Sequence, residues 1–267
     1  MRSLRELMDL EGRVALITGG GGHLGSAMGD ALAELGATIV VLDSAPDVCV
    51  QTATRIHETF SVETLPLVID LADEAAVRSV PGRILDRLGR LDILVNCAAL
   101  VGTSELKGWA VSFAEQRSDT WRRALEVNLT APFVLVQACA EALARSRHGS
   151  VINIGSIYGI VGPDMSLYEN TSLGLPAAYS ATKAGLIQLS RWLATVLAPK
   201  VRVNSITLGG VWRNQPEAFH RRYVARTPLG RMATEEDIKG ATAYLASDLS
   251  LYVTGENLVL DGGWTAW

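Results

Sequence analysis

The chain has 267 residues, of which 48% are hydrophobic and 19% are charged, so it can bury a core without disulfide or metal staples. This composition excludes a structureless chain. Its 24 basic and 28 acidic side chains give a net charge of −4. That balance argues against a nucleic-acid-binding protein, which would normally carry a basic face.

We expect one domain over residues 1–267, because no repeat, low-complexity tract or Pro/Ser-rich linker divides the sequence. The three cysteines, Cys49, Cys97 and Cys139, are too far apart for metal-ligand spacing, and each is expected to be a small buried residue. The four histidines do not cluster with acids, so no metal site is predicted. The N-terminus lacks the apolar core of a signal peptide, and no apolar run approaches the roughly 20 residues that span a bilayer. We therefore predict a cytoplasmic protein without a membrane partner.

Short apolar runs alternate with helical patterns along the whole chain. Seven runs predict strands, over residues 14–18, 38–43, 65–70, 92–96, 151–156, 201–207 and 256–262. Helical patterns such as residues 25–35 and 75–88 lie between them. Strands that are apolar throughout suit a parallel sheet that is buried on both faces. The order predicts a doubly wound α/β fold, with about seven parallel strands and helices on both faces of the sheet.

Two segments interrupt this alternation, residues 157–176 and 209–228, and both are rich in glycine, proline and polar side chains. Each follows the end of a predicted strand. Ligands of open α/β sheets bind beyond the carboxyl ends of the strands, so the two segments are candidate substrate loops. The alternative is that they are surface insertions without a ligand.

A glycine-rich loop, TGGGGHLG at residues 18–25, follows the first strand and opens a helix. Its spacing of Gly19, Gly22 and Gly25, around His23 and Leu24, lets the backbone approach the pyrophosphate of a dinucleotide, as in a Rossmann fold.

Asp43 ends the second strand, where a carboxylate can accept hydrogen bonds from the adenosine ribose. Residues 43–47 hold two acids and no base, which would repel a 2′-phosphate, so NAD(H) is predicted rather than NADP(H). Asp70, at the end of the third strand, either contacts the adenine or caps the next helix.

The stretch YSATK places Tyr179 and Lys183 four residues apart, on one face of a predicted helix over residues 177–197. Alone, this spacing also fits an ordinary surface pair. Ser156 ends a predicted strand, and Asn128 lies in the helical stretch EVNLTAPF.

These residues resemble motifs of the short-chain dehydrogenase/reductase family. The same family resemblance is carried by LVNCAA, VINIGS, VRVNSITLGG, PLGRM and TGENLVLDGG, and it covers nearly the whole chain. The resemblance implies an NAD-dependent oxidoreductase that interconverts a secondary alcohol and a ketone. The catalytic residues it implies are Asn128, Ser156, Tyr179 and Lys183. The further cofactor contacts it implies are Asp70, Leu71, Asn96, Ala98, Gly209 and Val211, together with Tyr179 and Lys183.

In that family Tyr179 would be the acid/base, Ser156 would position the substrate oxygen, and Asn128 would hold a water that links Lys183 to solvent. Lys183 would also hold the nicotinamide ribose and stabilise the tyrosinate. A free tyrosine has a pKa of about 10, so Tyr179 would need a lowered pKa to act as a base near neutrality.

The chain departs from the family at several cofactor positions. His23 stands where most members have the middle glycine, and the glycine spacing is closer to that of the extended, sugar-nucleotide branch, for which this chain is too short. Cys97 and Ala99 replace the usual asparagine and glycine after the fourth strand. Leu208 replaces a proline, and Arg213 replaces a threonine that often contacts the cofactor amide.

Ser156 and Tyr179 are 23 residues apart, a longer separation than is usual in the family. The added segment supplies Asp164, Tyr168, Glu169, Asn170 and Thr171, and the second loop supplies Trp212, Arg213, Asn214, Gln215, His220, Arg221, Arg222 and Arg226. Hydroxyl-directed groups beside cations suit a polar or anionic sugar-type substrate. The predicted substrate-binding residues are Ser156, Tyr168, Arg213 and Asn214, whereas the HRRY run could instead be a solvated helix face.

The two loops also resemble a subgroup of the family from surface-polysaccharide and nonulosonic-acid sugar pathways. The competing predictions are reduction of a 3-oxoacyl thioester and a non-catalytic, NAD-binding regulatory protein. The family implies a homotetramer or homodimer, packed through the helices that carry Asn128 and Tyr179. Trp264 and Trp267 either lie at a subunit interface or are buried against their own chain.

Overall fold

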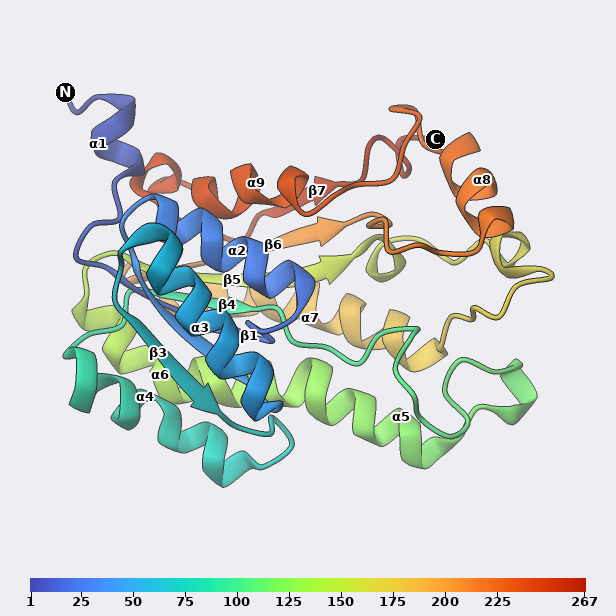
Figure 1. Cartoon of the computed structure of the whole chain (residues 1–267), viewed down its shortest axis with the longest axis horizontal. Helices are drawn as coiled ribbons and strands as arrows, with labels where there is room; N and C mark the ends of the chain where they lie inside the picture. The colour runs from blue at the N-terminus through green and yellow to red at the C-terminus, as the bar shows by residue number, and fades with distance from the viewer.

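A computed structural model describes all 267 residues, and the predicted doubly wound α/β fold is confirmed. Seven parallel strands form one sheet in the order β3-β2-β1-β4-β5-β6-β7 (Figure 1). The strands are β1 (Val14–Thr18), β2 (Thr38–Asp43), β3 (Thr64–Val68), β4 (Ile93–Asn96), β5 (Gly149–Ser156), β6 (Val201–Leu208) and β7 (Asn257–Leu260).

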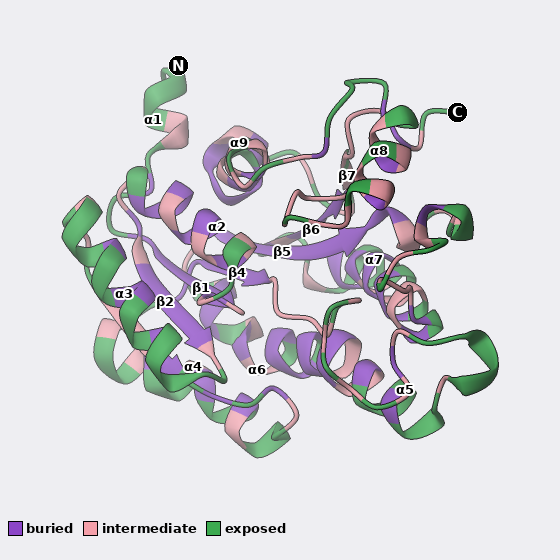
Figure 2. Ribbon diagram, turned by 45° about the vertical axis from the view of Figure 1, so that its right-hand side comes forward, coloured by how far each residue is buried: buried purple, intermediate pink, exposed green.

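The helices are α1 (Leu4–Met8), α2 (His23–Glu34), α3 (Pro46–Phe60), α4 (Glu74–Leu88), α5 (Ser118–Leu125), α6 (Ala131–Arg145), α7 (Ala177–Leu197), α8 (Glu217–Ala225) and α9 (Glu236–Ala246). Two separate hydrophobic cores lie on the two faces of the sheet. Side chains of α2, α3 and α9 fill one core, and side chains of α4, α6 and α7 fill the other. Figure 2 shows the result, with buried strands at the centre and exposed residues on the outer faces of the helices.

Most predicted strand boundaries agree with the structure to within two residues, and the differences lie at turns. β3 ends at Val68 rather than at Asp70, because the Asp70 carboxylate accepts a hydrogen bond from the Ala72 amide and starts a turn. β7 ends at Leu260 rather than at Gly262, because Gly262 and the next residue have positive φ angles, which a strand does not accommodate.

A chain of buried polar side chains fixes α7 against the centre of the sheet. The Asn96 amide donates to Asn153 Oδ1 at 2.8 Å, and the Asn153 amide donates to Ser190 Oγ of α7 at 2.8 Å. Ser205 of β6 donates to the same Ser190 oxygen, again at 2.8 Å. Each group is buried, so breaking one bond would leave a polar atom unpaired. This chain sets the position of α7, which carries Tyr179 and Lys183.

The continuous helix Ser118–Arg145 is long and apolar enough to cross a membrane by length and composition, so the expectation that no such run exists was wrong. It comprises α5, a π-helical turn over Glu126–Thr130, and α6. More than half of its most apolar window is buried inside the protein, and α6 contributes eight buried residues. Its apolar character is therefore accounted for by its place in the core of the fold.

Asp248, in the turn after α9, binds two arginines of the N-terminal segment. Its carboxylate, 3% exposed, forms ion pairs with Arg2 and, at 2.8 Å, with Arg13, and lies 3.2 Å from His148 Nδ1. Burial alone would raise the pKa of Asp248, but the hydrogen bonds and charges of Arg2 and Arg13 outweigh it and hold the pKa below its ordinary value.

Candidate active site

One cavity of about 1100 Å³ lies along the carboxyl ends of the strands, between the glycine loop and the two candidate substrate loops. Two of the predicted site residues, Asn96 and Asn128, do not line it. The predicted residues that do are Gly19, Gly22, His23, Leu24, Gly25, Asp43, Asp70, Leu71, Ala98, Ser156, Tyr168, Tyr179, Lys183, Gly209, Val211, Arg213 and Asn214.

The glycine loop has the backbone shape that a diphosphate requires. Gly19 has a φ of +63°, and a side chain there would approach the Ala98 Cα to 2.9 Å. A Cβ on Gly25 would overlap the Gly19 carbonyl oxygen. Because only glycine fits at both positions, the loop turns tightly and brings the N-terminus of α2 to the cavity, where its free amides and dipole favour an anion. The loop fits the diphosphate of a dinucleotide.

Acidic side chains line one end of the cavity, together with the glycine loop. Asp43 Oδ2 accepts a hydrogen bond from the Gly21 amide at 3.1 Å, and Asp43 Oδ1 accepts one from the Ala45 amide at 3.2 Å. These bonds hold the carboxylate at the cavity edge, with lone pairs left for the two hydroxyls of a ribose.

Asp70 has two protein partners, the Ala72 amide and Arg123, whose Nη2 lies 3.2 Å from its carboxylate. The backbone bond and the Arg123 guanidinium outweigh the effect of burial and lower the pKa of Asp70. The helix that follows is capped by Asp73 instead, so the alternative in which Asp70 caps it was wrong.

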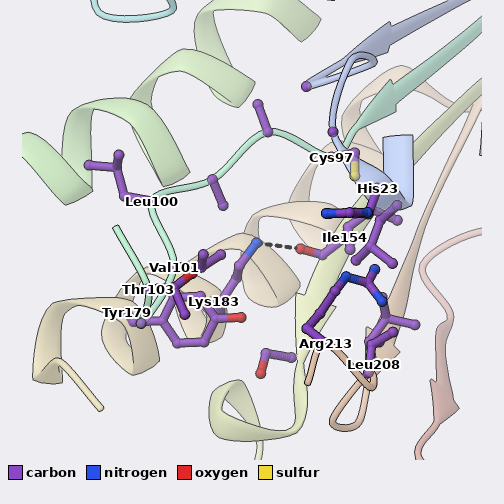
Figure 3. Close-up of a pocket in the computed structure, with 18 of the residues that line it drawn as sticks. His23, Cys97, Leu100, Val101, Thr103, Ile154, Tyr179, Lys183, Leu208 and Arg213 are labelled. Carbon is purple, nitrogen blue, oxygen red and sulfur yellow. Dashed lines mark hydrogen bonds between the residues drawn. The ribbon is translucent and has the colours of Figure 1, made fainter. Parts of the chain in front are cut away.

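Tyr179 and Lys183 lie close together in the cavity (Figure 3), and Ser156 lines the same cavity. Ser156 Oγ accepts a hydrogen bond from the Tyr158 amide at 3.2 Å, which leaves its proton for another acceptor. Burial raises the pKa of Tyr179, and the Ser156 hydroxyl opposes that rise. In the chain without a cofactor, Tyr179 is therefore held as a neutral phenol that can donate a proton.

Lys183 is buried and donates to the Ile154 carbonyl oxygen at 2.7 Å, a bond drawn dashed in Figure 3. Its Nζ lies 5.8 Å from the centroid of the Tyr179 ring. Burial lowers the pKa of Lys183 to about 8. Cys97 lines the cavity nearby, and burial raises its pKa to about 11, so it is a neutral thiol at physiological pH.

Asn128 lies behind the cavity, fully buried in the π-helical turn. Its Oδ1 accepts from the Leu100 amide at 2.7 Å, and its Nδ2 donates to the Leu100 carbonyl at 3.0 Å and to Thr182 Oγ1 at 3.2 Å. Thr182 in turn donates to the Tyr179 carbonyl at 2.8 Å. Both amide protons are used, so the side chain ties the loop after β4 to the helical turn that carries Tyr179. A water relay to Lys183 would have to involve the backbone of Asn128.

Asn96 is buried at the end of β4, where its amide donates to Asn153. Its side-chain amide is therefore engaged within the protein.

Aromatic and apolar side chains form the wall beyond Ser156, and sequence reasoning missed most of them. Tyr168 of the added segment donates from its hydroxyl to the Tyr158 hydroxyl at 2.9 Å. Phe219 and Tyr223, four residues apart on α8, stack behind this pair. Their spacing on one helical face was a usable signal, whereas the Ile154 carbonyl that receives Lys183 has no sequence signature.

Most of the predicted cluster of cations does not line the cavity. Arg222 donates to the carbonyl of Glu169 at 2.6 Å, and Arg226 forms an ion pair with Asp164. Both therefore fasten α8 to the added segment. His220 packs against Trp212, with ring centroids 4.4 Å apart and the ring planes tilted by 53°. Of the basic residues in the second loop, only Arg213 reaches the cavity.

The two C-terminal tryptophans differ in their surroundings. Trp264 is buried against its own chain, stacked on Tyr223 with ring centroids 5.9 Å apart and edge-on to Tyr158. Trp267 is exposed. The first therefore supports the wall of the cavity from behind.

Comparison with known proteins supports the same fold and chemistry. The protein-family model described as enoyl-(acyl carrier protein) reductase matches residues 22–265. The 3-oxoacyl-(acyl-carrier-protein) reductase FabG of Escherichia coli is 31% identical, over 96% of this chain and 98% of that protein. The trans-4-hydroxycyclohexanecarboxylate dehydrogenase of Sinomonas cyclohexanicum is 34% identical, over 95% of this chain and 93% of that protein.

Two solved structures are also similar. The gluconate 5-dehydrogenase of Burkholderia cenocepacia, in complex with NADP and tartrate, superposes with a TM-score of 0.87 at 29% identity, and the match covers 99% of this chain and 100% of that one. An NAD+-bound xylitol dehydrogenase superposes with a TM-score of 0.82 at 27% identity, covering 95% of this chain and 99% of that one.

Proposed function

This chain belongs to the short-chain dehydrogenase/reductase family and is an oxidoreductase that acts on CH–OH groups, and from that premise we propose that it uses NAD(H) to interconvert a polar secondary alcohol and its ketone. One observation carries the proposal. Tyr179, Ser156 and Lys183 line the same cavity as the glycine loop and Asp43, so a dinucleotide and a carbinol can meet there.

In this proposal Tyr179 gives its proton to the carbonyl oxygen during reduction and takes a proton from the alcohol during oxidation. Ser156 donates a hydrogen bond to the same substrate oxygen. The cofactor supplies the hydride. Lys183 lies close enough to the Tyr179 ring for its charge to favour the tyrosinate, and Asn128 holds the helical turn beneath Tyr179 in place. General acid–base catalysis of this kind contributes about 10²- to 10⁴-fold to the rate.

The choice of NAD(H) over NADP(H) rests on charge at the adenosine end of the cavity. Asp43 is held there by two backbone amides, and its negative charge would repel a 2′-phosphate. The next residue, Ser44, also lines the cavity and brings no positive charge. The cation on that side, Arg123, is already paired with Asp70.

For the substrate we propose a hydroxylated, sugar-type alcohol or ketone that is neutral rather than anionic. Tyr158 and Tyr168 offer hydroxyls to such a molecule, and Asn214 offers an amide. Arg222 and Arg226 are engaged with the added segment, so they bring little charge to a bound anion. The narrower resemblance to enzymes of surface-polysaccharide and nonulosonic-acid sugar pathways belongs to this proposal. A cytoplasmic location also belongs to this proposal, and so does a homodimer or homotetramer. Light scattering would measure the oligomeric state.

The first test is calorimetric titration of NADH and NADPH into the wild type and into Asp43→Asn, which keeps an oxygen for the Gly21 amide but removes the charge. We expect the wild type to prefer NADH and the variant to lose that preference. Glu58→Gln, which changes an exposed acid of α3 outside the cavity, is the matched control. An unchanged preference for NADH over NADPH in Asp43→Asn would show that this carboxylate does not discriminate between the two dinucleotides.

A second candidate is reduction of a 3-oxoacyl thioester, which the 31% identity to FabG favours. A panel of polyols, cyclic alcohols and their ketones, run against 3-oxoacyl thioesters with NAD(H), separates the two. Turnover of the thioesters alone would overturn the sugar-type substrate. The sequence also left open a non-catalytic, NAD-binding regulatory protein. If the wild type binds neither dinucleotide, this alternative fails together with the proposed enzyme, because both require NAD.

A further inference from the structure

We propose that Arg213 is the cation that binds the diphosphate of the dinucleotide, and that Glu235 competes with the cofactor for it. The inference rests on the proposed use of NAD(H) and assigns two residues that the proposal does not otherwise employ. It starts from one juxtaposition. The Glu235 carboxylate lies 2.8 Å from Arg213 and 3.8 Å from His23 Nδ1, and both of these side chains line the cavity.

The backbone around Arg213 is fixed by its own hydrogen bonds. The Arg213 amide donates to Gln215 Oε1 at 2.7 Å, and Gln215 Nε2 donates back to the Val211 carbonyl at 2.8 Å. The Trp212 amide donates to the Ala233 carbonyl at 2.8 Å, which pins the loop to the segment before α9. With the main chain held at both ends, the position of the guanidinium is set by its side-chain torsions and by its partners.

Glu235 is the residue before α9, and its carboxylate has no part in starting that helix. Asp237 performs that task, since it accepts from the Thr234 amide at 2.8 Å and pairs with Arg231 at 2.7 Å. The ion pairs of Glu235 are those with Arg213 and His23. Its side chain is 41% exposed, so Arg213 can exchange it for another anion at small cost.

His23 and Arg213 approach the same region from opposite sides. Figure 3 shows the Arg213 side chain rising from the loop after β6 toward the His23 ring, away from Tyr179. His23 is the first residue of α2, directly after the glycines that fit a diphosphate. The guanidinium is therefore directed at the region in front of the glycine loop.

The charges along the cavity single out Arg213. The basic residues that line the cavity are His23, Arg123, Lys183 and Arg213. Arg123 is paired with Asp70 at the adenosine end, and Lys183 donates to the Ile154 carbonyl beside Tyr179. A diphosphate brings two negative charges, and a planar guanidinium can donate two parallel hydrogen bonds to phosphate oxygens. Arg213 is the fixed positive charge between the two ends of the cavity.

The competition predicts two variants with opposite effects. Arg213→Gln removes the charge and should weaken binding of NADH by about tenfold, the size expected for one charge-assisted hydrogen bond. Glu235→Gln removes the competing carboxylate and should tighten NADH binding. Arg213→Lys keeps the charge without the planar fork and should fall between the wild type and Arg213→Gln.

The test is calorimetric titration of NADH and of ADP-ribose, which has the diphosphate but no nicotinamide. Arg213→Gln should weaken both ligands alike, and Glu235→Gln should tighten both. Arg78→Gln, which alters an exposed arginine of α4 far from the cavity, is the matched control. Thermal unfolding of each variant identifies any that fail to fold, and the tightening in Glu235→Gln does not depend on a loss of function.

Three results would overturn the inference. A loss for NADH with unchanged ADP-ribose would assign Arg213 to the nicotinamide instead of the diphosphate. Unchanged affinities in both Arg213 variants, or weaker binding in Glu235→Gln, would make the ion pair a structural contact only. A wild type that binds neither dinucleotide would instead defeat the proposed cofactor, and the variants would not be needed to show it.

Discussion

Tyr179 and Lys183 share one buried corner of the cavity, yet each is shifted by burial toward its neutral form. The pKa of Tyr179 is raised, and that of Lys183 is lowered to about 8. A neutral phenol is the form that can protonate a ketone, and a tyrosinate is the form that can accept a proton from an alcohol. Burial therefore favours the neutral phenol, and the tyrosinate requires positive charge beside the ring.

This asymmetry predicts opposite pH profiles for the two directions. For ketone reduction, kcat/KM should be constant at low pH and fall as the pH rises past the pKa of Tyr179, because the proton donor is lost. For alcohol oxidation, kcat/KM should rise with pH over the same range, because the tyrosinate is formed. Steady-state kinetics in both directions, across neutral and alkaline pH, provide the measurement.

Tyr179→Phe should lower kcat by about 10²- to 10⁴-fold in both directions and leave NADH affinity nearly unchanged. Tyr244→Phe, on the exposed side of α9, should behave as the wild type. Identical pH profiles for the two directions would contradict the role of Tyr179.

Gly25 tests the shape of the glycine loop without touching a charge. Gly25→Ala should abolish NADH binding and lower stability, because the new Cβ overlaps the Gly19 carbonyl oxygen. Gly82→Ala is the matched control in the interior of α4, where a Cβ would meet nothing within 4 Å. That control should gain about 0.5–1 kcal/mol of stability. Urea unfolding and NADH titration of the two variants give the comparison, and equal behaviour would argue against a tight loop.

At the level of single residues, the sequence indicated side chains that follow strand ends or share a helical face. Ser156 follows a strand end, Tyr179 and Lys183 share a helical face, and the resemblance to the family assigned all three to the site. Glu235 could not be predicted, because nothing in its sequence neighbourhood shows that the second loop folds back to bring Arg213 beside it. The hydrogen bond from the Asn96 amide to Asn153 could not be predicted either, because only the three-dimensional register of β4 and β5 reveals it.

At the level of elements, the segment over residues 157–176 is held in place by α8. Arg222 donates to the carbonyls of Glu169 and Leu167, the latter at 3.4 Å, and Arg226 pairs with Asp164. The segment brings Tyr168 against Tyr158 at the cavity wall. Sequence reasoning predicted that this segment borders the substrate, but it left open whether the arginines of α8 bind a ligand or lie on a solvated face, because a partner that is a backbone carbonyl leaves no trace in the sequence.

Removing one of these contacts should loosen the segment. Arg222→Ala should raise KM for the substrate severalfold with a smaller change in kcat, because a hydrogen bond from a charged group contributes about 1.5–3 kcal/mol. It should also speed proteolytic cleavage within residues 160–172. Arg221→Ala is the matched control, since Arg221 is exposed on the same helix and makes no side-chain hydrogen bond or ion pair. Equal cleavage rates for the two variants would refute the anchoring role of Arg222.

At the level of the whole molecule, Asp248 joins parts of the chain that are far apart in sequence. Asp248→Asn leaves Arg13 buried without its counter-ion and should lower the free energy of unfolding by about 3 kcal/mol at neutral pH. Because the folded-state pKa lies below the ordinary value of 3.8, the stabilisation is complete above that value and is lost as the pH falls through the folded pKa. Urea unfolding should therefore show the gap between variant and wild type closing in acid.

Glu141→Gln, which alters an exposed pair on α6, is the control for this measurement and should change stability little at any pH. A gap for Asp248→Asn that persists in acid would mean that its carboxylate is not the source of the stabilisation.

The overall fold was predictable because seven apolar strands alternate with helical patterns along the chain, and this alternation is typical of one parallel sheet. The long apolar helix Ser118–Arg145 shows that the sequence pattern predicts helix boundaries less well than it predicts the fold. A π-helical turn joins α5 to α6 without a break, and no residue signal separates that continuous helix from the shorter ones around it.

The way α8 grips the added segment has a consequence for how the protein can diverge. Arg222 holds the carbonyl oxygens of Leu167 and Glu169, and a carbonyl is identical whatever side chain its residue carries. Mutations at these positions can therefore accumulate without releasing the anchor, while neighbours such as Tyr168 line the cavity. The anchor therefore does not depend on the side chains of the segment, and those side chains can change while the fold is kept. Homologues of this chain could differ in substrate through substitutions in this one short segment.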